Sequence, residues 1–128
     1  MRQEFKDSQQ GVFLRYKIWL ATITGDGILG EGRWRLLAGI DKHHSLRAAA
    51  EELGISYRKA WGDIRQAEAV LGYQIIRKER GGHGGGRSNL TSKGRKLLEA
   101  FQALQKELDR SVEDAFRRFS DRVDGKQI

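Results

Sequence analysis

Two helical segments joined by a tight turn are the feature that most constrains the fold of this chain. Ser45 and Ser56 are each suited to an N-cap, because a serine hydroxyl can accept a hydrogen bond from a free backbone N–H in the first helical turn. Between them, Gly54 tolerates the left-handed conformation in which many helices end, and Ile55 can fill the corner. The pattern predicts one helix after Ser45 and another after Ser56.

Apolar residues recur at helical spacing in both segments. A generic pair of short amphipathic helices would show the same stripes, but the two caps, the turn glycine and small alanines at 50 and 60 together favour two helices that cross closely. The predicted inward-facing residues are Leu46, Ala49, Ala50 and Leu53 in the first segment and Ala60, Ile64, Ala67 and Leu71 in the second.

Two predicted short strands, Ile75–Lys78 and Ser88–Leu90, enclose a glycine-rich loop. This loop, Arg80 to Arg87, has five glycines in six successive positions. A helix-turn-helix followed by a strand, loop and strand is the layout of a winged helix-turn-helix. We therefore predict an α+β, mainly α, fold of this class.

The segment before residue 45 predicts a hairpin and a helix. Side chains alternate between apolar and polar from Phe13 to Leu20, which indicates a half-buried strand. Gly25-Asp26-Gly27 predicts a turn after which Ile28-Leu29 pairs back. A helix is then expected from about Glu31 to Lys42.

A long helix is predicted from the cap residue Thr91 to about Phe119. At 1.5 Å per residue, about 28 residues extend ~42 Å, which is more than so small a body can cover. We expect its apolar stripe to pack against a second copy of the chain, with folding back onto the Phe13–Leu20 hairpin as the alternative. The predicted dimerisation residues are Leu97, Phe101, Leu104, Leu108, Val112, Ala115 and Phe119.

These elements suggest a division of the chain. Residues 12–90 would form the winged helix-turn-helix domain, and residues 91–120 the long dimerisation helix. The polar ends, 1–11 and 121–128, are expected to be flexible tails.

The excess positive charge lies on one part of the chain. The formal net charge is +7, and residues 42–96 hold 12 Lys and Arg against 5 Asp and Glu, so the remainder is balanced. Basic surface near a helical reading element is typical of proteins that bind nucleic acid. A solvated basic surface and attraction to anionic lipid are the alternatives, and the localisation of the charge favours nucleic acid over both.

An outward face of the segment after Ser56 is predicted to read DNA. With Ala60 and Ile64 turned inward, Arg58 can bond a guanine edge, and Gly62 lets a backbone approach closely. Lys59 lies towards the flank and suits a phosphate, while Trp61 could equally pack where the helix meets the wing. The candidate DNA-binding residues are Ser45, Arg47, Ser56, Tyr57, Arg58, Lys59, Trp61, Arg65, Arg80, His83, Arg87, Lys93 and Arg95.

The sequence gives little support to catalysis, and we expect no enzyme, metal or cofactor. Gly81 to Ser88 is one residue away from a phosphate-binding P-loop, but it lacks the required lysine and the strand-to-helix context. There is no cysteine, and neither the three histidines nor the carboxylates stand at ligand spacing. With no apolar run of ~20 residues and no signal-peptide pattern, a soluble cytoplasmic protein is expected.

The stretch Gly54-Ile-Ser-Tyr-Arg-Lys-Ala-Trp61 resembles a known family. Together with Ile64, the Arg80–Arg87 loop and Leu90-Thr91 followed by Gly94, it is similar to the N-terminal DNA-binding domain of the molybdate-responsive (ModE) regulators, which is related to the LysR-type winged helix. The resemblance covers about residues 12–120. It implies a dimer, joined through the first strand region and the last helix, that binds inverted-repeat operators near molybdate-transport or molybdoenzyme genes. Carried over, residues 56–59 and Trp61 become recognition-helix contacts, and Arg80 to Arg87 the wing.

The resemblance stops before the molybdate-binding part of that family. Full-length members continue into a pair of small β domains that bind molybdate, and this sequence ends at Ile128. Three explanations stay possible: a stand-alone family member that is regulated otherwise, a member that acts with a separate sensor, and a truncated form. The initial Met and the charged tail favour a complete gene product. The alternative functions are a non-specific architectural DNA-binding protein and a module that docks an acidic partner.

Overall fold

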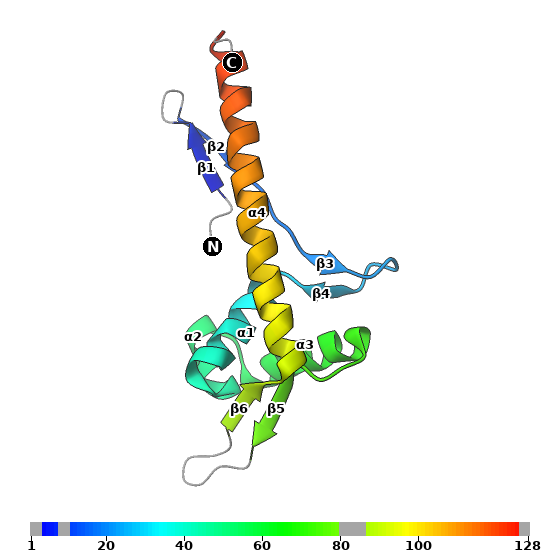
Figure 1. Cartoon of the computed structure of the whole chain (residues 1–128). Helices are drawn as coiled ribbons and strands as arrows, with labels where there is room; N and C mark the ends of the chain where they lie inside the picture. The colour runs from blue at the N-terminus through cyan, green and yellow to red at the C-terminus, as the bar shows by residue number, and fades with distance from the viewer. Residues whose placement is uncertain (1–3, 8–10, 80–86, 126–128) are drawn as a thin grey trace. The chain divides into compact units, whose positions relative to one another are not determined.

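The computed structural model describes residues 4–7, 11–79 and 87–125. They form six short strands and four helices, and the chain divides into two compact units (Figure 1). The first unit is residues 19–101, and the second is residues 1–18 together with 102–128. Within the described residues, no helix is both long and apolar enough to cross a membrane.

Three helices build the core of the first unit. They are α1 (Glu31–His43), α2 (Leu46–Leu53) and α3 (Tyr57–Leu71). A Cβ added at Gly39 of α1 would lie 2.9 Å from the Cβ of Ala49 in α2, so these helices pack at a distance that only glycine permits. Among the described residues, the largest fully buried side chains are those of Leu36, Leu37, Ile40, Leu46, Ile64, Ile75 and Phe101.

The turn between α2 and α3 follows the predicted capping pattern. The Ser45 hydroxyl accepts from the backbone N–H of Ala48, and the Ser56 hydroxyl accepts from that of Lys59, both at 3.0 Å. Gly54 ends α2 with φ of 71°, a left-handed conformation that favours glycine. Both helices therefore begin at their predicted residues.

A two-stranded wing follows α3. Strand β5 (Ile76–Glu79) pairs antiparallel with β6 (Arg87–Leu90), so that Ile76 stands opposite Leu90. The wing is attached to α1 through Ser88, whose backbone N–H donates to the carbonyl of His44 at 3.0 Å. These strands lie within one residue of their predicted ranges.

Helix α4 (Ser92–Val123) starts against the wing. The Thr91 hydroxyl caps it by accepting from the N–H of Gly94 at 3.0 Å, as predicted. Gly94 itself is buried. A Cβ at this position would lie only 2.1 Å from the carbonyl oxygen of Ile75, so the site has no room for a side chain. The helix runs beyond the predicted end at Phe119 and includes part of the expected 121–128 tail.

The predicted strand from Phe13 to Leu20 is wrong as a single element. Strand β2 (Val12–Arg15) pairs with β1 (Glu4–Asp7), whereas β3 (Leu20–Ala21) pairs with β4 (Gly27–Leu29). The alternation of side chains continues through residues 16–19, but these four residues belong to neither β2 nor β3. An apolar alternation predicts which side chains are covered, and a strand also needs a partner backbone.

The N-terminal segment also differs from its prediction. Residues 1–11 were expected to be a tail, yet residues 4–7 form β1, in register with β2 from Glu4 opposite Arg15 to Asp7 opposite Val12. The composition of this segment is polar, so the pairing comes from backbone hydrogen bonds to β2 and gives little hydrophobic signal. The pairing of Ile28-Leu29 in a hairpin is confirmed, since Leu29 stands opposite Leu20.

Candidate nucleic-acid interface

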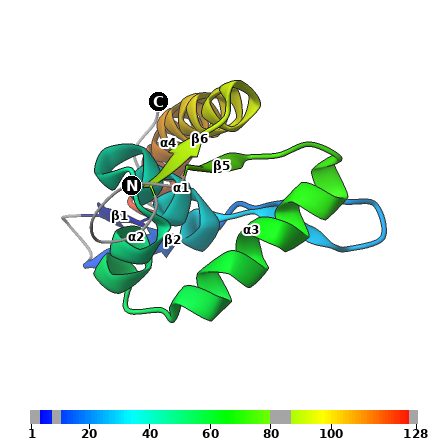
Figure 2. The same ribbon diagram turned by 90° about the horizontal axis from the view of Figure 1, so that it is seen from below.

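Helix α3 lies along the surface of the first unit (Figure 2), and two arginines are exposed on it. Ala60, Ile64 and Ala67 are buried, so the residues on the opposite side of the helix are turned outward. Arg58, Gly62 and Arg65 are exposed there. Apart from the adjacent residues and the backbone of α3 itself, no atom of the described residues lies within 4 Å of a Cβ built on Gly62, so another molecule can approach the helix closely at this point.

A cluster of three cations and two aromatic rings lies where α3 meets the wing. The rings of Tyr57 and Trp61 meet edge to face, with centroids 6.3 Å apart. The Arg47 guanidinium lies 4.3 Å from the Tyr57 centroid, and that of Arg65 lies 5.3 Å from the Trp61 centroid. Lys78, from β5, places its Nζ 5.9 Å from the first ring and 5.4 Å from the second. We call these five residues the cation–aromatic cluster.

The Tyr57 phenol is polarised within this cluster. The Trp61 side chain, and after it Lys78 and Arg47, lower the pKa of Tyr57 below its ordinary value of 10.0 against the opposing effect of burial. Lys78 Nζ donates to the phenolic oxygen at 3.2 Å, so the phenolic hydrogen points to another acceptor. A phosphate oxygen is an acceptor of the required kind.

Trp61 lies where the helix–wing alternative placed it. Its ring is half-buried between α3 and β5. Ser45 and Ser56 both act as helix caps, and Lys59 is exposed beside Asp63 on the other flank of α3. A role of these residues in DNA binding stays a prediction.

Only some of the DNA-binding residues predicted in the wing and at the start of α4 lie within the described part of the chain. Arg87 is exposed opposite Glu79, whereas Arg80 and His83 lie outside the described residues. Lys93 is exposed, with its Nζ 5.2 Å from the Tyr73 ring centroid.

Arg95 has a structural partner. Its guanidinium makes two hydrogen bonds with the Asp41 carboxylate, of 2.5 and 3.2 Å, and Asp41 raises the pKa of Arg95. The pair joins the start of α4 to α1. Contact between Arg95 and a DNA phosphate therefore requires competition with Asp41.

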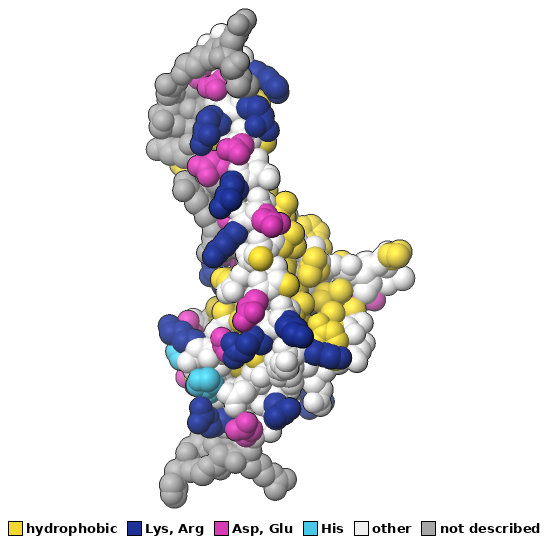
Figure 3. All heavy atoms as spheres, in the orientation of Figure 1, with side chains coloured by type: hydrophobic (Ala, Val, Ile, Leu, Met, Phe, Trp, Pro, Cys, Tyr) yellow, Lys and Arg dark blue, Asp and Glu magenta, His cyan; other side chains and the backbone are white. Residues whose placement is uncertain are grey.

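The predicted dimerisation stripe is only partly exposed. Phe101 is 2% exposed and belongs to the core of the first unit, so it offers no surface to a second copy. Phe119 is 52% exposed, with its ring stacked on Phe116 at 6.0 Å. Basic and acidic side chains alternate along the visible face of α4 (Figure 3). The remaining stripe residues are half-buried Leu97, Leu104, Leu108 and Val112 and exposed Ala115.

Three polar residues of this region were not predicted from the sequence. The position of Lys78 could have been predicted from the sequence. Side chains two apart in a strand share a face, so Lys78 lies on the same face of β5 as the buried Ile76. The positions of Arg33 and Asp63 could not, since their contact joins α1 to α3 across 30 residues of sequence.

An exposed basic helix at the end of a helix-turn-helix, followed by a two-stranded wing, defines a winged helix-turn-helix DNA-binding domain. The profile of the bacterial regulatory helix-turn-helix proteins of the LysR family matches residues 32–95, half of the chain. The chain belongs to this family.

The curated relatives confirm the resemblance to molybdate-responsive regulators. The molybdenum-pterin-binding protein MopB of Rhodobacter capsulatus is 36% identical over 77 residues, which cover 60% of this chain and 28% of MopB. The molybdenum transport protein ModE of Azotobacter vinelandii is 30% identical over 95 residues, or 74% of this chain and 34% of the relative. The chain thus spans about a third of the length of the relatives it matches.

Solved structures share the fold. The DNA-binding domain of CbnR, crystallised with DNA, has a TM-score of 0.54 at 21% identity, over 68% of this chain and 94% of that one. The DNA-binding domain of BenM, in complex with a benA DNA site, has a TM-score of 0.53 at 24% identity, over 70% and 94%. The winged helix-turn-helix fold predicted from the sequence is therefore confirmed.

Proposed function

We propose that this protein is a transcriptional regulator that reads a specific duplex DNA sequence by placing α3 in the major groove. The observation that carries the proposal is the outward face of α3, where Arg58 and Arg65 flank Gly62 beside the cation–aromatic cluster. Arginine can bond both acceptors of a guanine edge, and the absence of a side chain at Gly62 lets the helix backbone enter deeply. Family membership supports the same function.

The first experiment is selection from a random duplex pool at ~150 mM salt, where weak non-specific binding is suppressed. A recovered consensus supports sequence-specific regulation. Strong binding without a consensus would instead indicate an architectural DNA-binding protein. Failure to bind duplex even at low salt would favour docking of an acidic protein partner.

We further propose that the protein binds as a homodimer to an inverted repeat. Support comes from the apolar side chains of α4, among which Phe119 and Val123 are more than half exposed. A two-fold dimer would place its recognition helices about one helical turn apart, ~34 Å. Sedimentation should show a dimer for the parent protein and a monomer for Phe119→Asp. Ser111→Asp, an exposed α4 position outside the predicted stripe, is the matched control.

A connection to molybdate is proposed from the relatives alone. Both relatives described above carry molybdenum in their names, and the chain matches about a third of each. We infer that the regulated genes serve molybdate uptake or molybdoenzymes. Binding to the selected site should be measured with and without molybdate. An affinity change would make molybdate an effector of this chain, and an unchanged affinity would contradict direct sensing by it.

A further inference from the structure

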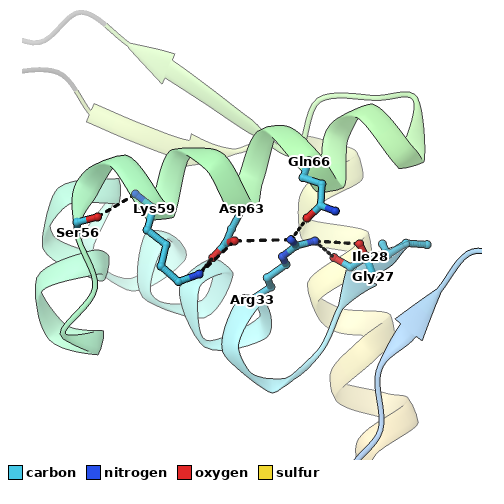
Figure 4. Close-up of polar contacts among 7 residues, drawn as sticks. All are labelled: Gly27, Ile28, Arg33, Ser56, Lys59, Asp63 and Gln66. Atoms are coloured by element: carbon cyan, nitrogen blue, oxygen red, sulfur yellow. Dashed lines mark hydrogen bonds and ion pairs between the residues drawn. The ribbon is translucent and has the colours of Figure 1, made fainter. Parts of the chain in front are cut away.

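An ion-pair network lies on the flank of α3 opposite the wing (Figure 4). Lys59 Nζ lies 3.1 and 3.4 Å from the two carboxylate oxygens of Asp63, one helical turn further along α3. The Arg33 guanidinium, from α1, lies 3.6 Å from the same carboxylate. Asp63 is thus shared between two cations.

The two cations differ in how firmly they are held. Arg33 donates to the carbonyl oxygens of Gly27 and Ile28, at 3.0 Å each, and to the side-chain oxygen of Gln66. Its side chain is 19% exposed, whereas that of Lys59 is 61% exposed. A competing anion can therefore draw Lys59 away at little cost, while Arg33 stays in place.

The network occupies a position that DNA phosphates would approach. Tyr57 and Trp61 lie on the wing side of the exposed α3 face, and Lys59 and Asp63 lie on its other side. A helix in the major groove has a phosphate backbone along each side. Lys59 could bind the backbone on its side, but in the free protein the Asp63 carboxylate holds its ammonium group.

We propose that Lys59 exchanges Asp63 for a DNA phosphate on binding, while Arg33 keeps the carboxylate in place. Asp63 is then a positioning residue that holds Lys59 in the free protein and lowers the affinity for duplex DNA of any sequence. This inference rests on the proposed function. It adds a residue that limits the electrostatic part of binding, which every genomic sequence shares.

The test compares Asp63→Asn, Lys59→Met and the double variant on a random-sequence duplex across a series of salt concentrations. Asp63→Asn should bind about two- to fivefold more tightly, as expected for the loss of one exposed ion pair. Lys59→Met should bind more weakly, with a salt slope shallower by about 0.9, because one phosphate contact is lost. The double variant should show none of the gain from Asp63→Asn, and Asp63→Glu should resemble the parent.

Two outcomes would overturn the inference. An equal gain from Asp63→Asn with and without Lys59 would mean that Asp63 acts by general repulsion. An unchanged salt slope in Lys59→Met would mean that Lys59 stays on Asp63 in the complex, and this variant serves even if Asp63→Asn folds poorly.

The controls are Glu107→Gln and Lys106→Met, which remove one charge of each sign from exposed positions of α4. Neither should change the affinity or the slope in the way that its α3 counterpart does. If the parent binds no duplex at all, the proposed function fails as well. If the parent binds and the variants match it, only the present inference fails.

Discussion

Lys78 on β5 donates a 3.2 Å hydrogen bond to the phenolic oxygen of Tyr57, the first residue of α3. The bond ties the wing to the start of the recognition helix. It also places an ammonium group beside the Tyr57 phenol, whose pKa is lowered first by the Trp61 side chain and then by Lys78 and Arg47. Lys78 of the wing and the first turn of α3 therefore lie side by side, on the surface that we propose binds DNA.

Lys78→Met should weaken binding to all duplex sequences by about 1 kcal/mol and make the salt slope shallower by about 0.9. The reason is that one phosphate-neutralising cation is lost and the Tyr57 hydroxyl loses its donor. Lys78→Arg should recover most of the affinity. Fluorescence anisotropy on random and selected duplexes provides the measurement. Weakening confined to the selected sequence would instead make Lys78 a base-reading residue.

Arg58→Ala should weaken binding to the selected site by about 1–3 kcal/mol and relax base preference at one position per half-site. Arg58 is exposed at the centre of the outward face of α3, where a guanidinium can reach a base edge. Repeating the random-pool selection with the variant gives the new consensus. A consensus identical to that of the parent protein would remove Arg58 from the base-reading residues.

The helices and their caps were predictable because they depend on neighbouring residues. Ser45, Gly54 and Ser56 act within one turn of their own positions, so spacing alone predicts the helix-turn-helix. The break after Arg15 could not be predicted this way, because the alternation continues where the partner strand ends. Pairing depends on a distant backbone, which side-chain periodicity does not report.

The residues of the candidate site that depend on the helical period could be predicted, and those that depend on distant contacts could not. Arg58 and Arg65 follow from the helical period once Ala60 and Ile64 are placed inward. Arg95 forms an ion pair with Asp41, which lies 54 positions away in the sequence. Asp63 forms one with Arg33, which lies 30 positions away. Only the packing of α1 against its neighbours brings these charges together, so no local pattern distinguishes a free cation from a paired one.

Glu52 should make stability depend on acidity. The His43 ring lies 2.5 Å from its carboxylate, and this bond, followed by the charge of Lys42, lowers the pKa of Glu52 below 4.5. A carboxyl whose pKa is lowered by folding stabilises the native state above its unfolded value, and the effect is lost as pH falls through the folded value. Glu52→Gln should therefore lower the urea midpoint at pH 7, and the difference should shrink as the pH is lowered from 4.5 to 3.

Glu51→Gln is the matched control, because this neighbouring carboxylate is exposed on the same helix. Its urea midpoint should follow that of the parent at both pH values. A Glu52→Gln defect of equal size at pH 7 and pH 3 would show that the contact acts through shape and not through charge.

Gly94→Ala should destabilise the protein by about 1–3 kcal/mol, the usual cost of forcing an extra carbon into a packed site. The added Cβ would lie 2.1 Å from the Ile75 carbonyl oxygen, which already accepts bonds from the Thr91 N–H and hydroxyl. Relief requires α4 to move away from the wing and disturbs the Thr91 cap. Urea unfolding followed by circular dichroism measures the change.

Gly62→Ala provides the opposite case on the same fold. Its Cβ would meet no atom of the described residues within 4 Å, and alanine favours a helix interior over glycine by about 1 kcal/mol, so stability should rise. DNA binding should nevertheless fall, because the added methyl group lies on the face that approaches the groove. Gly94→Ala, by contrast, should lower the stability of the protein, while the fraction that remains folded should still bind DNA. A gain in both stability and affinity for Gly62→Ala would contradict close approach of α3 to DNA at this residue.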